Sequence, residues 1–285
     1  MPSRFERLIH TRLCYRNKRT IPTMMLTTAT IVAVGLFLAT MSAVRAHEPT
    51  EDAEATSICD GDGSGTLFVG PGHAGRQSAG SKNAACQFSI RARLPLADTS
   101  QTDCQVSYTT VESRPNYVDV AVLTKGSCDG VRIYSSVTTP GATNVAESAS
   151  AQSSSRQALA KIVGHDVIDL PMFWHYSKAY WSYTSDLILS AQQEVNRFAD
   201  EYWHTHSTSS GKQMNTGNTR FRAWDSVSWH SDGYPGDSFP DVYAESRVEI
   251  IAEAGGGYAC DFEHEWTSGA GNYPDLHFHT QCWAE

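Results

Sequence analysis

Two histidines separated by one residue, His277 and His279, are the residues of this chain best suited to coordination chemistry. Alternate side chains of a β-strand point to the same face, so a strand over residues 275–283 would present both imidazoles together. Glu263 and Glu265 lie on the preceding predicted strand and would face the histidines in a hairpin. Imidazole and carboxylate form a ligand set for Zn²⁺ or Cu²⁺. Two cross-strand ion pairs without a metal are the favoured interpretation, and the metal site is the alternative.

A second pattern matches a metal site only in part. Residues 60–65 (DGDGSG) resemble the opening of a calcium-binding loop, with Asp60, Asp62 and Ser64 at alternate positions. Pro71 occupies the twelfth position, where a bidentate glutamate belongs, so a glycine-rich turn is the favoured interpretation. The sequence therefore predicts no obligatory cofactor, with Zn²⁺ or Cu²⁺ as the first alternative and Ca²⁺ as the second.

Residues 230–241 (HSDGYPGDSFPD) carry titratable groups on a segment rich in glycine and proline. Carboxylates beside aromatic rings are typical of a carbohydrate cleft, where paired acids hydrolyse glycosidic bonds. Turn formation alone also favours Asp, Gly and Pro, and neither a G-x-S-x-G nor an H-E-x-x-H motif occurs. If the protein is a hydrolase, its candidate catalytic residues are His230, Asp232, Asp237 and Asp241. The candidate ligand-stacking residues are Trp174, Trp181, Trp224 and Trp229.

Residues 59–140 contain segments in which apolar and polar side chains alternate between turn-forming residues, as is typical of an antiparallel β-meander. The predicted strands are 66–69, 86–94, 104–111, 117–124 and 131–138. Pairing the third strand with the fourth brings Cys104 close to Cys128. The sequence therefore predicts the disulfide Cys104–Cys128 and, by elimination, Cys59–Cys86.

The middle region, residues 146–205, is predicted to be a helical hairpin. Its first helix, residues 146–163, is rich in Ala, Ser and Gln and stops at Gly164. A long amphipathic, aromatic-rich helix then follows the capping residue Asp169 and Pro171. The apolar side chains of this helix recur at three- and four-residue spacing: Phe173, Tyr176, Tyr180, Thr184, Leu187, Ala191, Val195, Phe198 and Tyr202.

The C-terminal region, residues 219–285, returns to antiparallel β-structure, with predicted strands 219–229, 242–253, 257–266 and 275–283. The last two are predicted to form a hairpin because that register places Cys260 opposite Cys282 and gathers apolar side chains on one face. The disulfide Cys260–Cys282 follows. The expected fold class is α+β: two antiparallel β-sheet regions flanking a helical hairpin, disulfide-stabilised, in one globular unit from residue 59 to residue 285.

The N-terminal residues 1–46 are typical of a signal peptide. Basic residues crowd the first 19 positions, residues 31–38 (IVAVGLFL) are apolar, and Val44 and Ala46 suit the −3 and −1 positions of a cleavage site. An uncleaved membrane anchor is the alternative, because residues 20–44 carry no charge. We expect cleavage near Ala46 and a secreted, periplasmic or cell-surface location.

The cysteine count supports export. Cleavage removes Cys14 and leaves six of the seven cysteines, an even number that suits disulfides in an oxidising compartment. Residues 47–58 are then an acidic, flexible spacer at the start of the mature chain.

The net charge of the mature chain disfavours some classes of partner. The leader holds seven of the 22 basic residues and one of the 31 acidic residues, so the mature chain has 15 basic and 30 acidic residues. Such a surface repels phosphates and anionic lipids, so nucleic acid is not expected as a partner and membrane contact is limited to the signal segment. The first choice is a secreted, non-enzymatic binding or surface-interaction protein with a protein or glycan ligand. The alternatives are a hydrolase of a glycan or cell-wall polymer and a metal-binding module that uses the strand H-x-H.

Overall fold

The chain is all-β in the parts that the computed structural model describes, which are residues 52–58, 63–69, 76–78, 87–93, 104–114, 116–139, 153–166, 168–232, 241–268 and 276–285. Fifteen strands occur in these ranges, together with one short 3₁₀ turn, η1 (Ala254–Gly256). No helix in the described part of the chain is long and apolar enough to cross a membrane.

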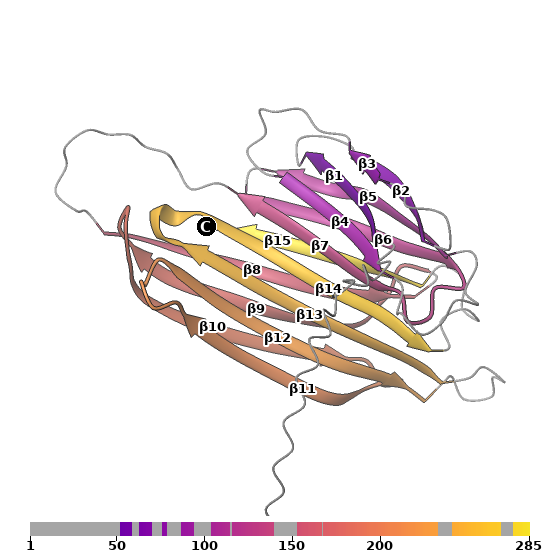
Figure 1. Cartoon of the computed structure of the whole chain (residues 1–285). Coiled ribbons are helices and arrows are strands. Elements are labelled where there is room, and N and C mark those ends of the chain that lie inside the picture. Colours follow the sequence, from indigo (N-terminus) through magenta and orange to yellow (C-terminus); the bar gives the residue numbers. More distant parts are fainter. Residues whose placement is uncertain are drawn as a thin grey trace, which may run out of the picture. The chain divides into compact units, whose positions relative to one another are not determined.

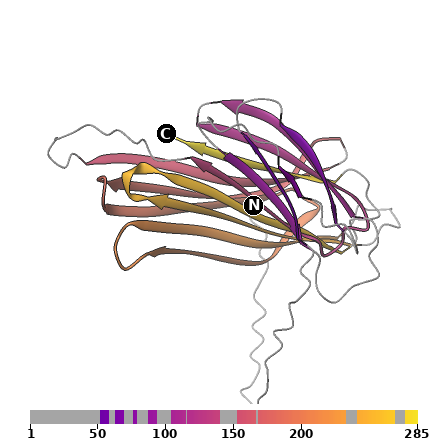
Figure 2. The same cartoon turned by 45° about the horizontal axis from the view of Figure 1, so that its top comes forward.

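The strands form two sheets that pack face to face (Figure 1, Figure 2). Sheet A has the order β11 (Trp203–Met214), β12 (Arg220–Ser231), β13 (Val242–Glu253), β14 (Tyr258–Ser268), β7 (Arg132–Thr139), β4 (Gln87–Arg93), β1 (Asp52–Ile58) and β3 (Arg76–Ser78). Sheet B has the order β10 (Ile188–Ala199), β9 (Pro171–Tyr183), β8 (Ser154–His165), β15 (His277–Ala284), β6 (Tyr117–Gly126), β5 (Cys104–Arg114) and β2 (Ser64–Val69). Neighbouring strands are antiparallel except β1 and β3.

The core lies between the sheets because every second side chain of each strand points inward. On β9, Phe173, Ala179 and Trp181 are buried, whereas the intervening Trp174 and Tyr176 lie on the outer face. Aromatic pairs join the two sheets, with ring centroids 4.6 Å apart for Phe173–Trp229 and 4.5 Å for Trp266–Phe278. Such pairs contribute about 0.5–1.5 kcal/mol beyond their buried area.

The predicted helical hairpin is wrong, and with it the α+β fold class. Residues 146–205 supply the strands β8, β9 and β10 and the start of β11 in the described part of the chain. A tight turn separates β9 from β10, in which Thr184 Oγ1 accepts hydrogen bonds from the backbone N–H groups of Asp186 and Leu187. Aromatic residues occupy both faces of β9. Apolar side chains therefore recur at three- and four-residue spacing, as in a helix, although the burial of alternate residues follows the two-residue period of a strand.

The predicted C-terminal hairpin is also wrong, although its disulfide is confirmed. Strand β14 pairs with β13 and β7 in sheet A, whereas β15 pairs with β8 and β6 in sheet B. The bond between Cys260 and Cys282, whose Cα atoms are 5.8 Å apart, therefore joins the two sheets across the core.

The predicted strands of residues 59–140 are present, but they divide between the sheets instead of forming one meander. The pairing of β5 with β6 is confirmed, with Cys104 opposite Gly126. The disulfide Cys104–Cys128 is confirmed as well. The predicted pair Cys59–Cys86 and the signal peptide lie outside the described residues.

Candidate metal centre

Three imidazoles and one carboxylate converge on the outer face of sheet B. They belong to His165, Asp169, His277 and His279, and one ligand atom from each lies within 4.8 Å of all the others. We call these four residues the histidine cluster.

Strand pairing brings the three histidines together. His277 and His279 share a face of β15 because they are two residues apart, and His277 lies directly opposite His165 at the end of β8. The ring centroid of His165 is 5.2 Å from that of His277 and 4.4 Å from that of His279. The cluster thus depends on two strands that are far apart in the sequence.

The turn between β8 and β9 supplies the carboxylate. Asp166 Oδ1 accepts hydrogen bonds from the backbone N–H groups of Ile168 and Leu170, which closes the turn. Asp169 has a φ of 65°, in the left-handed region that aspartate tolerates better than most residues. Its Oδ1 lies 2.9 Å from His165 Nδ1 and 3.2 Å from His277 Nε2. The same oxygen lies 3.8 Å from His279 Nε2.

A buried carboxylate on β6 orients one of the imidazoles. His279 Nδ1 is 3.0 Å from Asp119 Oδ1, and Gln281 Nε2 donates to Asp119 Oδ2 over 3.0 Å. A histidine that donates one ring N–H to a carboxylate directs its other nitrogen at a metal in many protein sites. Asp119 therefore leaves Nε2 of His279 free to face the cluster.

The protonation states suit coordination. Burial is the main cause that lowers the pKa of His165, and the neighbouring His279 lowers it further. Burial acts to raise the pKa of Asp169, but the hydrogen bond with His277 and the adjacent histidines outweigh it and lower that pKa. A neutral imidazole and an ionised carboxylate are the forms that bind metals.

The cluster contains two of the four predicted metal ligands. Glu263 and Glu265 lie on the outer face of sheet A, on the opposite side of the sandwich from His277 and His279. There they pair with Arg132, at 3.1 Å and 2.8 Å. His165, Asp169 and Asp119 were missed because only the pairing of β15 with β8 and β6 brings them near the H-x-H.

The predicted hydrolase residues are only partly described. His230 Nδ1 lies 3.4 Å from Asp232, and its Nε2 lies 3.5 Å from Asp241. Asp232 also lies 3.0 Å from His204 Nε2. Both aspartates are more than half exposed. Asp237 lies outside the described residues, as do Asp60, Asp62 and Pro71 of the calcium-like segment.

The four predicted stacking tryptophans separate into two pairs. Trp181 and Trp229 are 2% and 1% exposed and belong to the core. Trp174 lies on the outer face of sheet B, with Lys161 Nζ 5.0 Å from its ring, and Trp224 lies on the outer face of sheet A. Only the second pair is placed to meet a ligand.

A Ser–His–Asp arrangement that sequence patterns did not reveal lies inside the core. His175 Nδ1 is 2.8 Å from Asp225 Oδ2, and its Nε2 is 2.8 Å from Ser246 Oγ. Trp229 Nε1 donates to the same hydroxyl over 2.9 Å, and Arg197 pairs with Asp225. Because His175 and Asp225 are fully buried, this network has the distances of a catalytic triad without access for a substrate, and it stabilises the packing of the sheets.

No protein-family model matches the chain, and no curated protein shows significant sequence similarity to it. The fold and the cluster themselves define the class of protein. It is a two-sheet β-sandwich with at least two disulfides and a surface group of histidines and aspartate.

Proposed function

We propose that the protein binds Zn²⁺ through the histidine cluster. The observation that carries the proposal is the convergence of three imidazole nitrogens and one carboxylate oxygen within 4.8 Å. In a tetrahedral zinc site with bonds of about 2.0–2.1 Å, neighbouring ligand atoms are about 3.3 Å apart. Asp169 Oδ1 already lies 2.9–3.8 Å from the three nitrogens, so small side-chain shifts complete the site.

The donor set selects the class of metal. Calcium and magnesium prefer oxygen ligands, whereas imidazole with carboxylate suits Zn²⁺ or Cu²⁺. We choose Zn²⁺ because zinc sites in proteins are commonly four-coordinate with His and Asp among their ligands, and the cluster offers four such groups.

The compartment belongs to the same proposal. The two disulfides fit an oxidising environment, and the N-terminal sequence has the pattern of a signal peptide. We expect export, cleavage near Ala46, and zinc binding outside the cytosol. Intact-mass analysis of the secreted protein would then give a chain that begins at His47, and retention of the leader would contradict cleavage.

Titration of the purified protein with metal tests the site. The protein, prepared without a histidine tag and stripped with EDTA, is titrated calorimetrically with ZnCl₂ and, in a separate arm, with CuCl₂. We expect one Zn²⁺ per chain and at least tenfold weaker binding in His165→Ala and His279→Ala. His204→Ala is the matched control, because His204 also pairs with an aspartate at 3.0 Å but lies outside the cluster.

Two results would count against zinc binding at the cluster. They are the absence of saturable zinc binding and zinc binding that His165→Ala leaves unchanged, whereas tighter binding of Cu²⁺ is the ordinary order for imidazole and carboxylate ligands. Asp119→Asn gives an independent check. The change keeps the size of the side chain but removes the charge that orients His279, so zinc affinity should fall by about 10- to 100-fold.

A further inference from the structure

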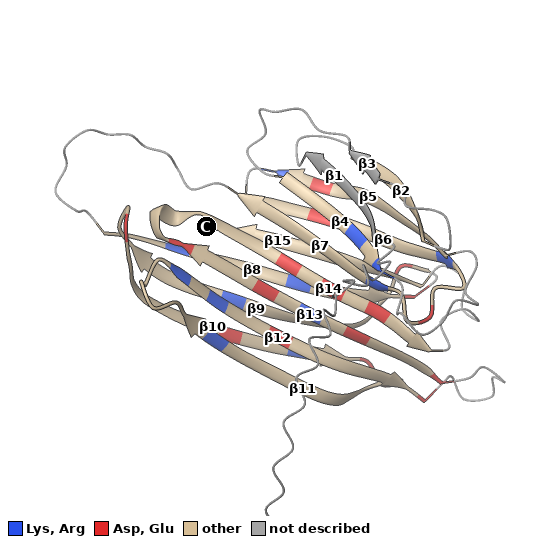
Figure 3. Ribbon diagram, in the orientation of Figure 1, with Lys and Arg blue, Asp and Glu red and all other residues tan. Residues whose placement is uncertain are grey.

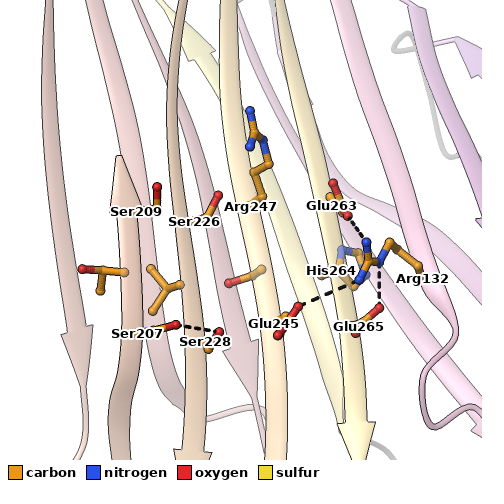
Figure 4. A pocket seen from close by; sticks show the side chains of 13 residues that line it. Arg132, Ser207, Ser209, Ser226, Ser228, Glu245, Arg247, Glu263, His264 and Glu265 are labelled. Atoms are coloured by element: carbon orange, nitrogen blue, oxygen red, sulfur yellow. Dashed lines mark hydrogen bonds and ion pairs between the residues drawn. The ribbon is translucent and has the colours of Figure 1, made fainter. Parts of the chain in front are cut away.

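The outer face of sheet A is hollowed on the side of the sandwich opposite the histidine cluster. The depression has a volume of about 260 Å³ and lies across β11, β12, β13 and β14, with Arg132 of β7 at one end (Figure 4). Its outward side chains are Arg132, Ser207, Ser209, Ser226, Ser228, Glu245, Arg247, Glu263 and Glu265. We call it the serine trough.

The trough exists because small side chains occupy adjacent positions on two strands. Ser207 pairs with Ser228 and Ser209 pairs with Ser226, so four hydroxymethyl groups cover an area that longer side chains fill elsewhere on the face. Ser207 Oγ donates to Ser228 Oγ over 3.1 Å. The floor is therefore shallow, wide and lined with hydroxyl groups.

An indole ring borders the floor. Trp224 is the outward residue of β12 that precedes Ser226, and it pairs with Gly211 on β11. A Cβ atom on Gly211 would lie 2.4 Å from Cζ2 of Trp224, so the ring lies across the glycine backbone. The guanidinium carbon of Arg247 lies over the ring, 5.5 Å from its centroid, and a sugar that stacks on that face takes the place of the guanidinium. The glycine thus leaves space for a flat aromatic surface beside the serines.

Charged residues of both signs line the trough on β7, β13 and β14, and Figure 3 marks the acidic and basic positions along the ribbons of β13 and β14. Arg132 lies 2.8 Å from Glu265, 3.1 Å from Glu263 and 3.9 Å from Glu245. Arg247 pairs with Glu249 at 3.0 Å. The guanidinium groups are thus paired with carboxylates. The side chains of Arg132 and Glu245 are nevertheless 43% and 53% exposed, so their N–H groups and oxygen atoms can still form hydrogen bonds with a ligand at the rim.

The chemistry of the lining excludes most ligand classes. An anion would be repelled by three carboxylates, and the guanidinium groups that could bind it are already paired. A cation would have to compete with Arg132 for the carboxylates. An apolar ligand would contact the hydroxyl groups of the floor without forming hydrogen bonds with them. A neutral ligand rich in hydroxyl groups matches the serines and carboxylates, and a sugar ring can stack on the indole. The volume is below the about 300–1,000 Å³ of typical small-molecule sites, which suits one or two sugar units of a longer chain.

We propose that the serine trough binds a neutral glycan, with Trp224 as the stacking residue and Glu245, Ser226 and Ser228 as hydrogen-bond partners. The proposal is independent of zinc, because the histidine cluster lies on the other sheet. The trough is open along β11, which is the last strand of sheet A on that side, so a polymer can continue beyond it.

An array of neutral, sialylated and sulfated glycans, probed with the disulfide-oxidised full chain in EDTA, tests the proposal. We expect retention of neutral glycans, and the strongest oligosaccharide is then titrated calorimetrically. Ser207→Trp, which fills the floor, and Trp224→Ala should each weaken its binding at least tenfold. Ser190→Trp is the matched control, because Ser190 is also an exposed edge-strand serine hydrogen-bonded to a serine of the neighbouring strand, at 2.7 Å.

Several results would overturn the proposal. They are no retention of any glycan, retention of acidic glycans alone, and loss of binding in Ser190→Trp or Trp174→Ala without loss in Trp224→Ala. If Ser207→Trp fails to fold, as judged by circular dichroism, Glu245→Gln takes its place. That variant removes only a charge from a half-exposed side chain, and we expect a three- to tenfold loss of affinity.

Discussion

Mild acid is expected to destabilise the protein through His264, an inward-facing residue of β14. The side chain is 1% exposed and lies on the ring of Phe278, with the centroids 4.4 Å apart. Neither ring nitrogen has a hydrogen-bond partner among the described residues. Burial therefore lowers the pKa of His264 from 6.5 to about 3, because the charged imidazolium is excluded from the core.

The direction of the pH effect follows from this difference. The unfolded chain binds a proton at His264 with a pKa of 6.5, and the folded chain does so only near 3. The unfolded state therefore binds more protons between these values, and the free energy of unfolding falls as the pH drops below 6.5. Over the full range this amounts to about 5 kcal/mol, and at pH 5 to about 2 kcal/mol.

Urea unfolding at pH 7.5, 6 and 5, followed by tryptophan fluorescence in the presence of EDTA, measures the effect. We expect the wild type to lose about 2 kcal/mol more than His264→Leu between pH 7.5 and pH 5, because the other titrating groups are common to both proteins. His204→Ala, which removes an exposed histidine, should lose as much stability as the wild type. Equal losses for the wild type and His264→Leu would refute the reasoning.

Three further predictions concern stability. Zinc at 100 times its dissociation constant should raise the free energy of unfolding by about 2.7 kcal/mol, and an unchanged unfolding midpoint with added ZnCl₂ would contradict specific binding to the folded state. Replacing Cys260 and Cys282 together by serine should lower stability by about 3 kcal/mol, since their bond closes a loop with a sequence separation of 22; equal stability of both forms under reducing conditions is the internal control. Ser246→Ala should lower stability by about 1–3 kcal/mol because it removes the hydrogen-bond partner of Trp229 Nε1 and His175 Nε2, and denaturant unfolding that matches the wild type would show that the network contributes nothing.

The strands predicted from the sequence are those in which one face is apolar and the other polar. Residues 242–253 alternate in this way and form β13 with the predicted bounds. Strand β9 could not be assigned in the same way, because its outer face carries Trp174, Tyr176 and Tyr180 and its inner face carries Phe173 and Trp181. When both faces are apolar, the period of the pattern no longer separates a strand from a helix.

Only part of the candidate site could be predicted from the sequence, for a related reason. The H-x-H pattern identifies His277 and His279 from local spacing alone. Their partners depend on which strands lie beside β15, and hydrophobic alternation says nothing of that choice. The disulfide Cys260–Cys282 was equally ambiguous, since a Cα separation of 5.8 Å fits cysteines of paired strands and cysteines of facing sheets. A correct cysteine pairing thus supported a wrong hairpin.

That disulfide links the two surfaces on which ligands are proposed to bind. Cys260 is three residues from Glu263 of the serine trough, and Cys282 is three residues from His279 of the histidine cluster. Reduction of one covalent bond would therefore loosen both ligand-bearing strands at once. The bond lies in the core, with Cys260 and Cys282 only 0% and 1% exposed, so it holds both strands in place although no ligand bridges the two faces.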